Sequence, residues 1–157
     1  MEPDAVERSV KRARELFDSG YSCAESSLKV LAELYGLEND RIWTAASGLG
    51  GGVARHQSMC GALLGAALAL GLREGLSGGG AKVVSGGVRP KVRRLLDGFR
   101  ERFGAVDCRQ LVPYDFNAPG GYEAFRNSDT MQQKCHHYVR YVVETLAKEH
   151  EHQARQR

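Results

Sequence analysis

The chain has 157 residues, of which 42% are hydrophobic and 26% are charged, and its formal net charge is +3. This length and composition are typical of one globular domain that is large enough to bury a core. The nearly balanced charge, without a basic stripe between aromatic residues, argues against nucleic-acid binding. The acidic N-terminus does not resemble a signal peptide, and the apolar segment 60–72 is short and interrupted by glycine. The sequence therefore predicts a cytoplasmic protein without a membrane span.

Hydrophobic residues at helical spacing predict an all-α fold, a single-domain bundle of about five or six helices around a buried central helix. The first helix is expected over about residues 6–17. The second begins at a capping box formed by Ser22 and Glu25 and runs to about residue 35. A short third helix is expected over residues 42–46.

The predicted central helix follows Ser58, its expected N-cap, and is apolar on nearly every side over residues 59–70. Its small residues would also suit a homodimer.

Residues 75–87 contain six glycines and two serines, which indicates a flexible loop. A further helix is expected from Pro90, and a last one from about residue 128. Residues 148–157 are expected to form a solvated tail of the single domain 1–157.

Four cysteines are the most informative residues of the chain. Cys23, Cys60 and Cys108 fall in the first turn of a predicted helix, where free N–H groups and partial positive charge favour a thiolate. Cys135 lies on the buried stripe of the last predicted helix, where a small hydrophobic role is the alternative. The sequence contains no Cys-x-x-Cys pair, so it has neither a thioredoxin motif nor a paired-knuckle zinc motif. Cytoplasmic cysteines are normally reduced, so a permanent disulfide framework is not expected.

A glycine-rich loop precedes the predicted central helix. Gly50, Gly51, Gly52, Arg55 and His56 are the candidate cofactor-binding residues, because glycines let the backbone approach a bulky group and a following helix start attracts anions. A tight turn between two packed helices is the alternative for the loop. Arg55 or His56 would stabilise a thiolate at Cys60, and a Cys–His nucleophilic pair is a further alternative.

The segments around the cysteines resemble a known family, the putative redox-active proteins named for their C-GCAxxG-C-C signature. The resemblance covers about residues 8–147, although residue 59 is Met where the signature has Gly. It implies that the four cysteines are the defining cysteines of the family and that the protein does redox work, with a hint of a cluster. The matching segments are Tyr21–Ala24, Gly50–Arg55, Cys60–Ala66, Leu70–Leu72, Cys108–Leu111, Tyr114–Asp115, Cys135 and Tyr138–Val139.

These observations predict a redox or electron-transfer protein whose four cysteines converge in one electropositive pocket. Cys23, Cys60, Cys108 and Cys135 are the expected catalytic residues and metal ligands, which either hold an iron–sulfur cluster or another metal such as zinc, or cycle between dithiol and disulfide. A redox partner protein would exchange electrons with them. The sequence is compatible with a thiol- or cluster-based oxidoreductase and names no substrate. The alternative is a helical interaction module with a structural Cys₄ zinc site or inert cysteines.

Overall fold

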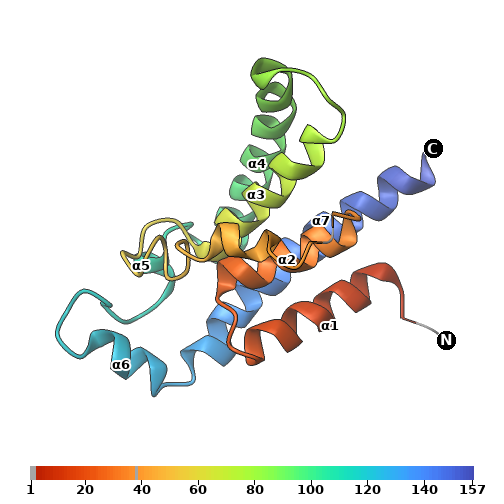
Figure 1. The fold of residues 1–157 in the computed structure, drawn as a ribbon. Coiled ribbons are helices and arrows are strands. Elements are labelled where there is room, and N and C mark those ends of the chain that lie inside the picture. Colours follow the sequence, from red (N-terminus) through yellow and green to blue (C-terminus); the bar gives the residue numbers. More distant parts are fainter. Residues whose placement is uncertain (1–2, 38) are drawn as a thin grey trace.

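The computed structural model describes residues 3–37 and 39–157, and Figure 1 shows their arrangement. Within these residues the regular structure is helical and no strand forms, so the predicted all-α single domain is confirmed. Its helices are α1 (Ala5–Asp18), α2 (Cys23–Leu34), α3 (Gly61–Gly75), α4 (Ala81–Phe103), α5 (Cys108–Leu111), α6 (Gly121–Arg126) and α7 (His136–Arg155), with a 3₁₀ turn at Ile42–Ala46 and a π-helical turn at Met131–Cys135.

Helices α1, α2 and α7 form the body of the molecule (Figure 1). The predicted capping box starts α2: the Glu25 backbone N–H donates to the Ser22 hydroxyl, and the Ser22 N–H donates to the Glu25 carboxylate. The core between these helices is made of apolar side chains at helical spacing. Its fully buried members include Leu28 and Leu31 of α2 and Val139, Val142, Val143 and Leu146 of α7.

Helix α3 packs closely on α2 at its N-terminal end. A Cβ atom at Gly65 would overlap the carbonyl oxygen of Ala24, so the approach of the two helices requires glycine there. Further along, Leu72 is 40% exposed and Leu76 is 63% exposed. Together, α3 and α4 form a hairpin that extends from the body (Figure 1). The prediction of a central helix that is buried on all sides is therefore not confirmed.

The predicted loop at residues 75–87 is mostly helical. Helix α4 begins at Ala81 and contains Pro90, so only residues 76–80 lie between α3 and α4. The glycine count favoured a loop, but packing against α3 overrides this local preference. Gly87 faces the Glu74 carboxylate of α3 without room for a Cβ atom, and Lys91 forms an ion pair with the same carboxylate. Pro90 removes one backbone donor from the helix without ending it.

The C-terminal segment at residues 148–157, predicted as a solvated helix end, is helical to Arg155, and residues 154–157 are exposed. Helix α7 continues to Arg155, and one of its faces contacts α2 and α3. The His150 ring lies 5.4 Å from the ring of Tyr35, and Gln153 accepts a hydrogen bond from Arg73. None of the helices in residues 3–37 and 39–157 combines the length and the apolar character that a bilayer crossing requires.

Candidate functional site

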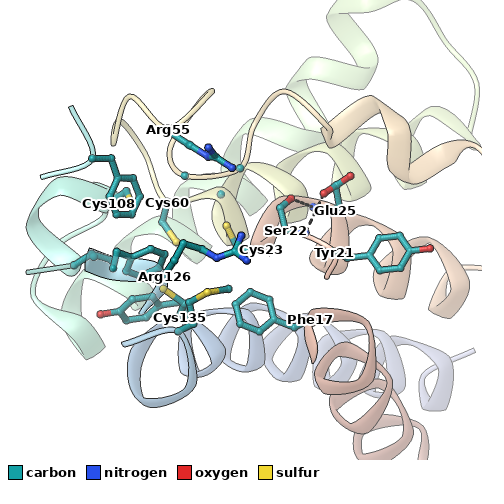
Figure 2. Close-up of a pocket in the computed structure, with 18 of the residues that line it drawn as sticks. Phe17, Tyr21, Ser22, Cys23, Glu25, Arg55, Cys60, Cys108, Arg126 and Cys135 are labelled. Atoms are coloured by element: carbon teal, nitrogen blue, oxygen red, sulfur yellow. Dashed lines mark hydrogen bonds between the residues drawn. The ribbon is translucent and has the colours of Figure 1, made fainter. Parts of the chain in front are cut away.

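The four cysteines line one cavity, although each comes from a different element (Figure 2). The cavity has a volume of about 930 Å³. Cys23 is the first residue of α2, Cys60 immediately precedes α3, Cys108 is the first residue of α5, and Cys135 ends the π-helical turn before α7. All four are free thiols; Cys60 and Cys108 are buried, and Cys23 and Cys135 are partly exposed.

Main-chain hydrogen bonds fix Cys60 and Cys108 relative to each other. The Cys60 N–H donates to the Val106 carbonyl, and the Cys108 N–H donates to the Ser58 carbonyl, each over 2.8 Å. Between them, Met59 and Asp107 form an antiparallel bridge. This pairing uses the backbone of residues 58–60, which explains why α3 begins at Gly61 and not directly after the predicted cap, Ser58. Two cysteines that are far apart in sequence are thereby held as one unit.

The loop before Cys60 forms a left-handed turn. Five consecutive residues, Gly51 to Arg55, have φ between +50° and +72°. Val53, Ala54 and Arg55 are L-residues with side chains, for which this conformation costs roughly 1–2 kcal/mol each. The turn is closed by backbone bonds, of which one runs from Arg55 N–H to the Gly50 carbonyl over 3.0 Å. Strain of this size persists where the surrounding structure imposes it, and it concentrates at functional sites.

Gln57 connects this strained turn to the segment between α5 and α6. Its side chain is only 2% exposed and makes two hydrogen bonds of 2.8 Å, donating to the Tyr114 carbonyl and accepting from the Phe116 N–H. Its amide nitrogen also lies 4.0 Å from the Cys108 sulfur. The buried amide therefore joins the two chain segments that carry Cys60 and Cys108. Sequence reasoning missed Gln57, because one glutamine in a loop carries no signal of burial.

The glycine after Cys60 makes room for the sulfur of Cys23. A Cβ atom at Gly61 would overlap Cys23 Sγ and would crowd the Leu49 carbonyl and the Ala24 N–H. Gly65, one turn later, lets α2 approach as described above. The Cys-Gly-Ala-x-x-Gly pattern at residues 60–65 is thus a packing surface that brings Cys23 beside Cys60.

Burial raises the pKa of every cysteine thiol in the cavity, because a buried thiolate loses its hydration. The pKa of Cys108 rises to about 11, through burial and the neighbouring Cys23, with the Gln57 amide acting in the opposite direction. For Cys60, burial and then Cys23 are the largest causes of a strong increase. The predicted stabilisation of thiolates by helix starts is therefore outweighed in the free protein. At Cys23 the backbone N–H groups still favour the thiolate and so oppose the increase of its pKa by burial. These N–H groups belong to Gly51, Ala24, Cys23 and Gly61.

The candidate cofactor-binding residues divide into two groups. Gly50, Gly51 and Arg55 line the cavity. Gly52 is buried against the Ser58 backbone and serves the fold of the turn. His56 is exposed and does not belong to the cavity wall, so the Cys–His nucleophilic pair finds no support.

An aromatic wall, which packs beside Cys108 and Cys135, was not predicted from the sequence. Phe116, Tyr122 and Phe125 pack against one another, with ring centroids 4.8–6.0 Å apart, and Arg126 of α6 lines the cavity beside them. The aromatic residues lie too irregularly in the sequence to produce a helical or strand pattern. Their clustering after Cys108 was the available signal, because aromatic residues in a polar loop need a buried surface.

The site does not fit a single metal ion as it stands. Within residues 3–37 and 39–157, no three His, Cys, Asp or Glu side chains lie close enough together to hold one ion. A structural zinc ion needs four such donors in a tetrahedron. An iron–sulfur cluster instead distributes its cysteine ligands over several iron atoms, and four cysteines around one cavity are the donor set that such clusters use.

Comparison with known proteins agrees with the cysteine pattern. A family model described as "Putative redox-active protein (C_GCAxxG_C_C)" matches residues 21–149 of the chain. No curated protein and no solved structure gives a match.

Proposed function

Because the chain belongs to the C_GCAxxG_C_C family of putative redox-active proteins, we propose that Cys23, Cys60, Cys108 and Cys135 act together as one redox centre. The observation that supports this proposal is their common position in the wall of one cavity. Four cysteines that served only as packing would not need to meet. In the C_GCAxxG core, Gly61 and Gly65 bring Cys23 and Cys60 together.

The redox group in this proposal is an iron–sulfur cluster held by the four cysteines. Such a cluster, when bound, accepts and donates single electrons. The chain contributes the thiolate ligands and a set of dipoles: the backbone N–H groups of Gly51, Ala24 and Gly61 face the Cys23 sulfur and stabilise negative charge on it. The apolar side chains around the cavity, among them Phe17, Phe125 and Tyr138, exclude water from the sulfurs. A partner protein would deliver or receive the electrons.

A second candidate is a dithiol–disulfide site formed by Cys23 and Cys60. The specific observation in its favour is that the Cys23 sulfur packs against Gly61, the residue that directly follows Cys60. Oxidation would join the two sulfurs by one S–S bond and pass two electrons and two protons to the disulfide of an acceptor protein, which becomes two thiols. The raised pKa of both thiols would make this exchange slow at neutral pH, since the thiolate is the attacking form.

Purification without oxygen tests the proposal. Iron and acid-labile sulfide are expected in the purified protein, together with a visible absorption band that bleaches on reduction. Gly61→Ala, which places a methyl group against Cys23 Sγ, is expected to lose most of the iron. Gly71→Ala on the same helix has open space around it and is the matched control that should keep the iron.

Two other outcomes would redirect or end the proposal. A colourless protein that loses two thiols on mild oxidation, with Cys23 and Cys60 joined in a peptide map, would establish the dithiol site instead. A protein with no iron and with four thiols that resist oxidation would exclude a redox centre of either kind.

A further inference from the structure

The cavity is much larger than the redox centre needs. Its volume of about 930 Å³ lies at the upper end of the range of roughly 300–1,000 Å³ that is usual for small-molecule sites. A disulfide or a cluster beside the four sulfurs would fill only one side of it. Arg55, Phe116, Tyr122 and Arg126 also line the cavity, and Figure 2 shows the Arg126 side chain reaching toward the sulfurs. The space next to the sulfurs is therefore large enough for a small organic molecule.

Positive charge exceeds negative charge around the cavity, because three arginines line it and only two carboxylates, Asp18 and Glu25, do so. Arg14 is paired with Asp18, with 3.0 Å between Nε and Oδ2. Glu25 is used in the capping box of α2. Arg55 and Arg126 also line the cavity, and neither makes an ion pair in the part of the chain that the structure describes. Uncompensated positive charge in a cavity attracts an anion.

The fold holds Arg55 in a defined position. Its guanidinium carbon lies 3.7 Å from the centroid of the Tyr122 ring, a cation–π contact between the left-handed turn and α6. The backbone of Arg55 has φ of +63°, an unfavourable conformation for a residue with a side chain. Gly51 permits it, because a Cβ atom there would lie 2.9 Å from Arg55 Cα. The strained turn therefore places a cation at the cavity wall and keeps it there.

The aromatic wall offers apolar ring faces and edges in the same cavity as the two arginines. The rings of Phe116 and Tyr122 meet edge to face with centroids 5.2 Å apart, and Phe125 lies 4.8 Å from Phe116. All three rings line the cavity. Aromatic walls bind flat, unsaturated molecules by stacking and edge contacts. A guanidinium group, in turn, binds a carboxylate through two parallel hydrogen bonds.

We propose that the cavity binds a small organic carboxylate with a flat apolar body. Arg55 and Arg126 bind the carboxylate, and Phe116 and Tyr122 contact the body, which then lies next to the cysteine sulfurs. Binding of the carboxylate does not require the proposed redox function. Only the chemical group that the bound molecule faces, a cluster or a pair of cysteines, rests on that proposal. Such binding would give the cavity a small-molecule ligand next to the sulfurs, in addition to any exchange with a protein partner.

Binding of benzoate to the full chain, purified without oxygen, tests this proposal. Benzoate titrated into ¹⁵N-labelled protein should shift the amide signals of residues 50–57 and 114–126, with a dissociation constant on the order of 1 mM or lower. Acetate lacks the flat body and benzyl alcohol lacks the charge, so both should bind at least about tenfold more weakly. Arg55→Gln and Arg126→Gln should each weaken benzoate binding about tenfold. Arg89→Gln, an exposed arginine of α4 outside the cavity, is the matched control and should bind like the wild type.

The same titration contains the results that overturn the proposal. Equal binding of benzoate and benzyl alcohol would exclude recognition of the carboxylate. Unchanged binding in Arg126→Gln, which lies on α6 and does not disturb the left-handed turn, would do the same. No shift with benzoate would exclude the site. Cys60→Ser should retain benzoate binding, so a failure of the redox centre and a failure of the carboxylate site give different results.

Discussion

Two hydrophobic clusters build this molecule, and they differ in how they are made. The larger one joins α1, α2, α3, α4 and α7 through side chains at regular helical spacing, most of them aliphatic, with the rings of Phe17, Phe99 and Tyr138 among them. The smaller one consists of Cys108, Val112 and Phe125 with a few aromatic neighbours from the irregular segment around α5 and α6. Cys60 belongs to the larger cluster, Cys108 belongs to the smaller one, and Cys135 touches both. The cavity that contains the four cysteines therefore lies at the boundary between a regular core and an irregular wall.

This difference shows where the fold accepts unfavourable conformations. The larger cluster uses ordinary helices, of which α2 and α3 approach closely at Gly61 and Gly65. The wall toward the smaller cluster contains the left-handed turn and the buried Gln57 amide. Strained and buried polar features thus gather on the side of the cavity that carries Arg55 and the aromatic residues, while the other side consists of regular helices. Variants on the two sides should consequently behave differently.

The largest loss of stability is expected in the larger cluster, from Gly65→Ala. The new methyl group would overlap the Ala24 carbonyl, so α2 and α3 would have to separate. We expect the free energy of unfolding to fall by about 3 kcal/mol in urea titrations. Gly71→Ala, which faces open space on the same helix, should instead raise it by about 0.5–1 kcal/mol. Equal effects of the two substitutions would contradict the close packing of α3 on α2.

The second effect concerns the link between the clusters. Gln57→Ala leaves the Tyr114 carbonyl and the Phe116 N–H buried without partners, which should cost about 2 kcal/mol. Hydrogen exchange should accelerate in residues 111–126 more than in α2 or α7, because Gln57 holds the smaller cluster. Gln110→Ala is the control: this exposed side chain should change stability by less than about 0.5 kcal/mol. Uniform acceleration over the whole chain would show that the two clusters unfold as one unit.

A smaller effect of opposite sign is expected in the left-handed turn. Ala54 has φ of +50°, and glycine adopts this conformation without the clash of a Cβ atom. Ala54→Gly should therefore raise the free energy of unfolding by about 0.5–1 kcal/mol. The same replacement at Ala67, within α3, should lower it by about the same amount. A loss of stability at both positions would argue that the turn is not strained.

The smallest effect should appear at the end of the larger cluster that is remote from the cysteines. Burial against Tyr35, then the charges of Arg73 and Arg157, lower the pKa of His150, and Glu151 opposes them. A histidine that is neutral in the folded state and binds a proton in the unfolded state destabilises the fold as pH falls below about 6.5. Thermal unfolding measured between pH 7 and 5 should show a shallower loss of stability in His150→Gln than in the wild type. His56→Gln, whose side chain is exposed, should follow the wild type, and an identical slope for all three would refute the effect.

Sequence reasoning succeeded where one local rule decided the structure. The capping box at Ser22 placed Cys23 correctly at the start of α2, and the apolar stripe of α7 identified its core residues. It failed at Ala81–Gly87, where glycines suggested a loop and contact with α3 formed a helix. The left-handed turn after Gly52 could not be foreseen, because Val53, Ala54 and Arg55 individually disfavour it.

The sequence indicated which cysteines would lie together, but it did not indicate their protonation state. Four cysteines at predicted helix starts and on one helix stripe indicated a common site, and the cavity contains all of them. The expected thiolate character did not follow, since the depth of burial of a sulfur depends on the whole fold. Arg126 and the aromatic wall arise from contacts across the cavity, which periodicity along the chain does not reveal.

The π-helical turn at Met131–Cys135 gives the molecule an adjustable spacer between its two packing units. Such a turn holds one residue more than the corresponding α-helical turn, and each residue of a helix corresponds to a rotation of about 100°. Deleting the exposed Gln133 would therefore swing the chain that leads to α6 around the axis of α7, while the apolar repeat of α7 itself stayed intact. Chain length at this single point thus sets how Met131 and Phe125 meet Cys108 in the smaller cluster.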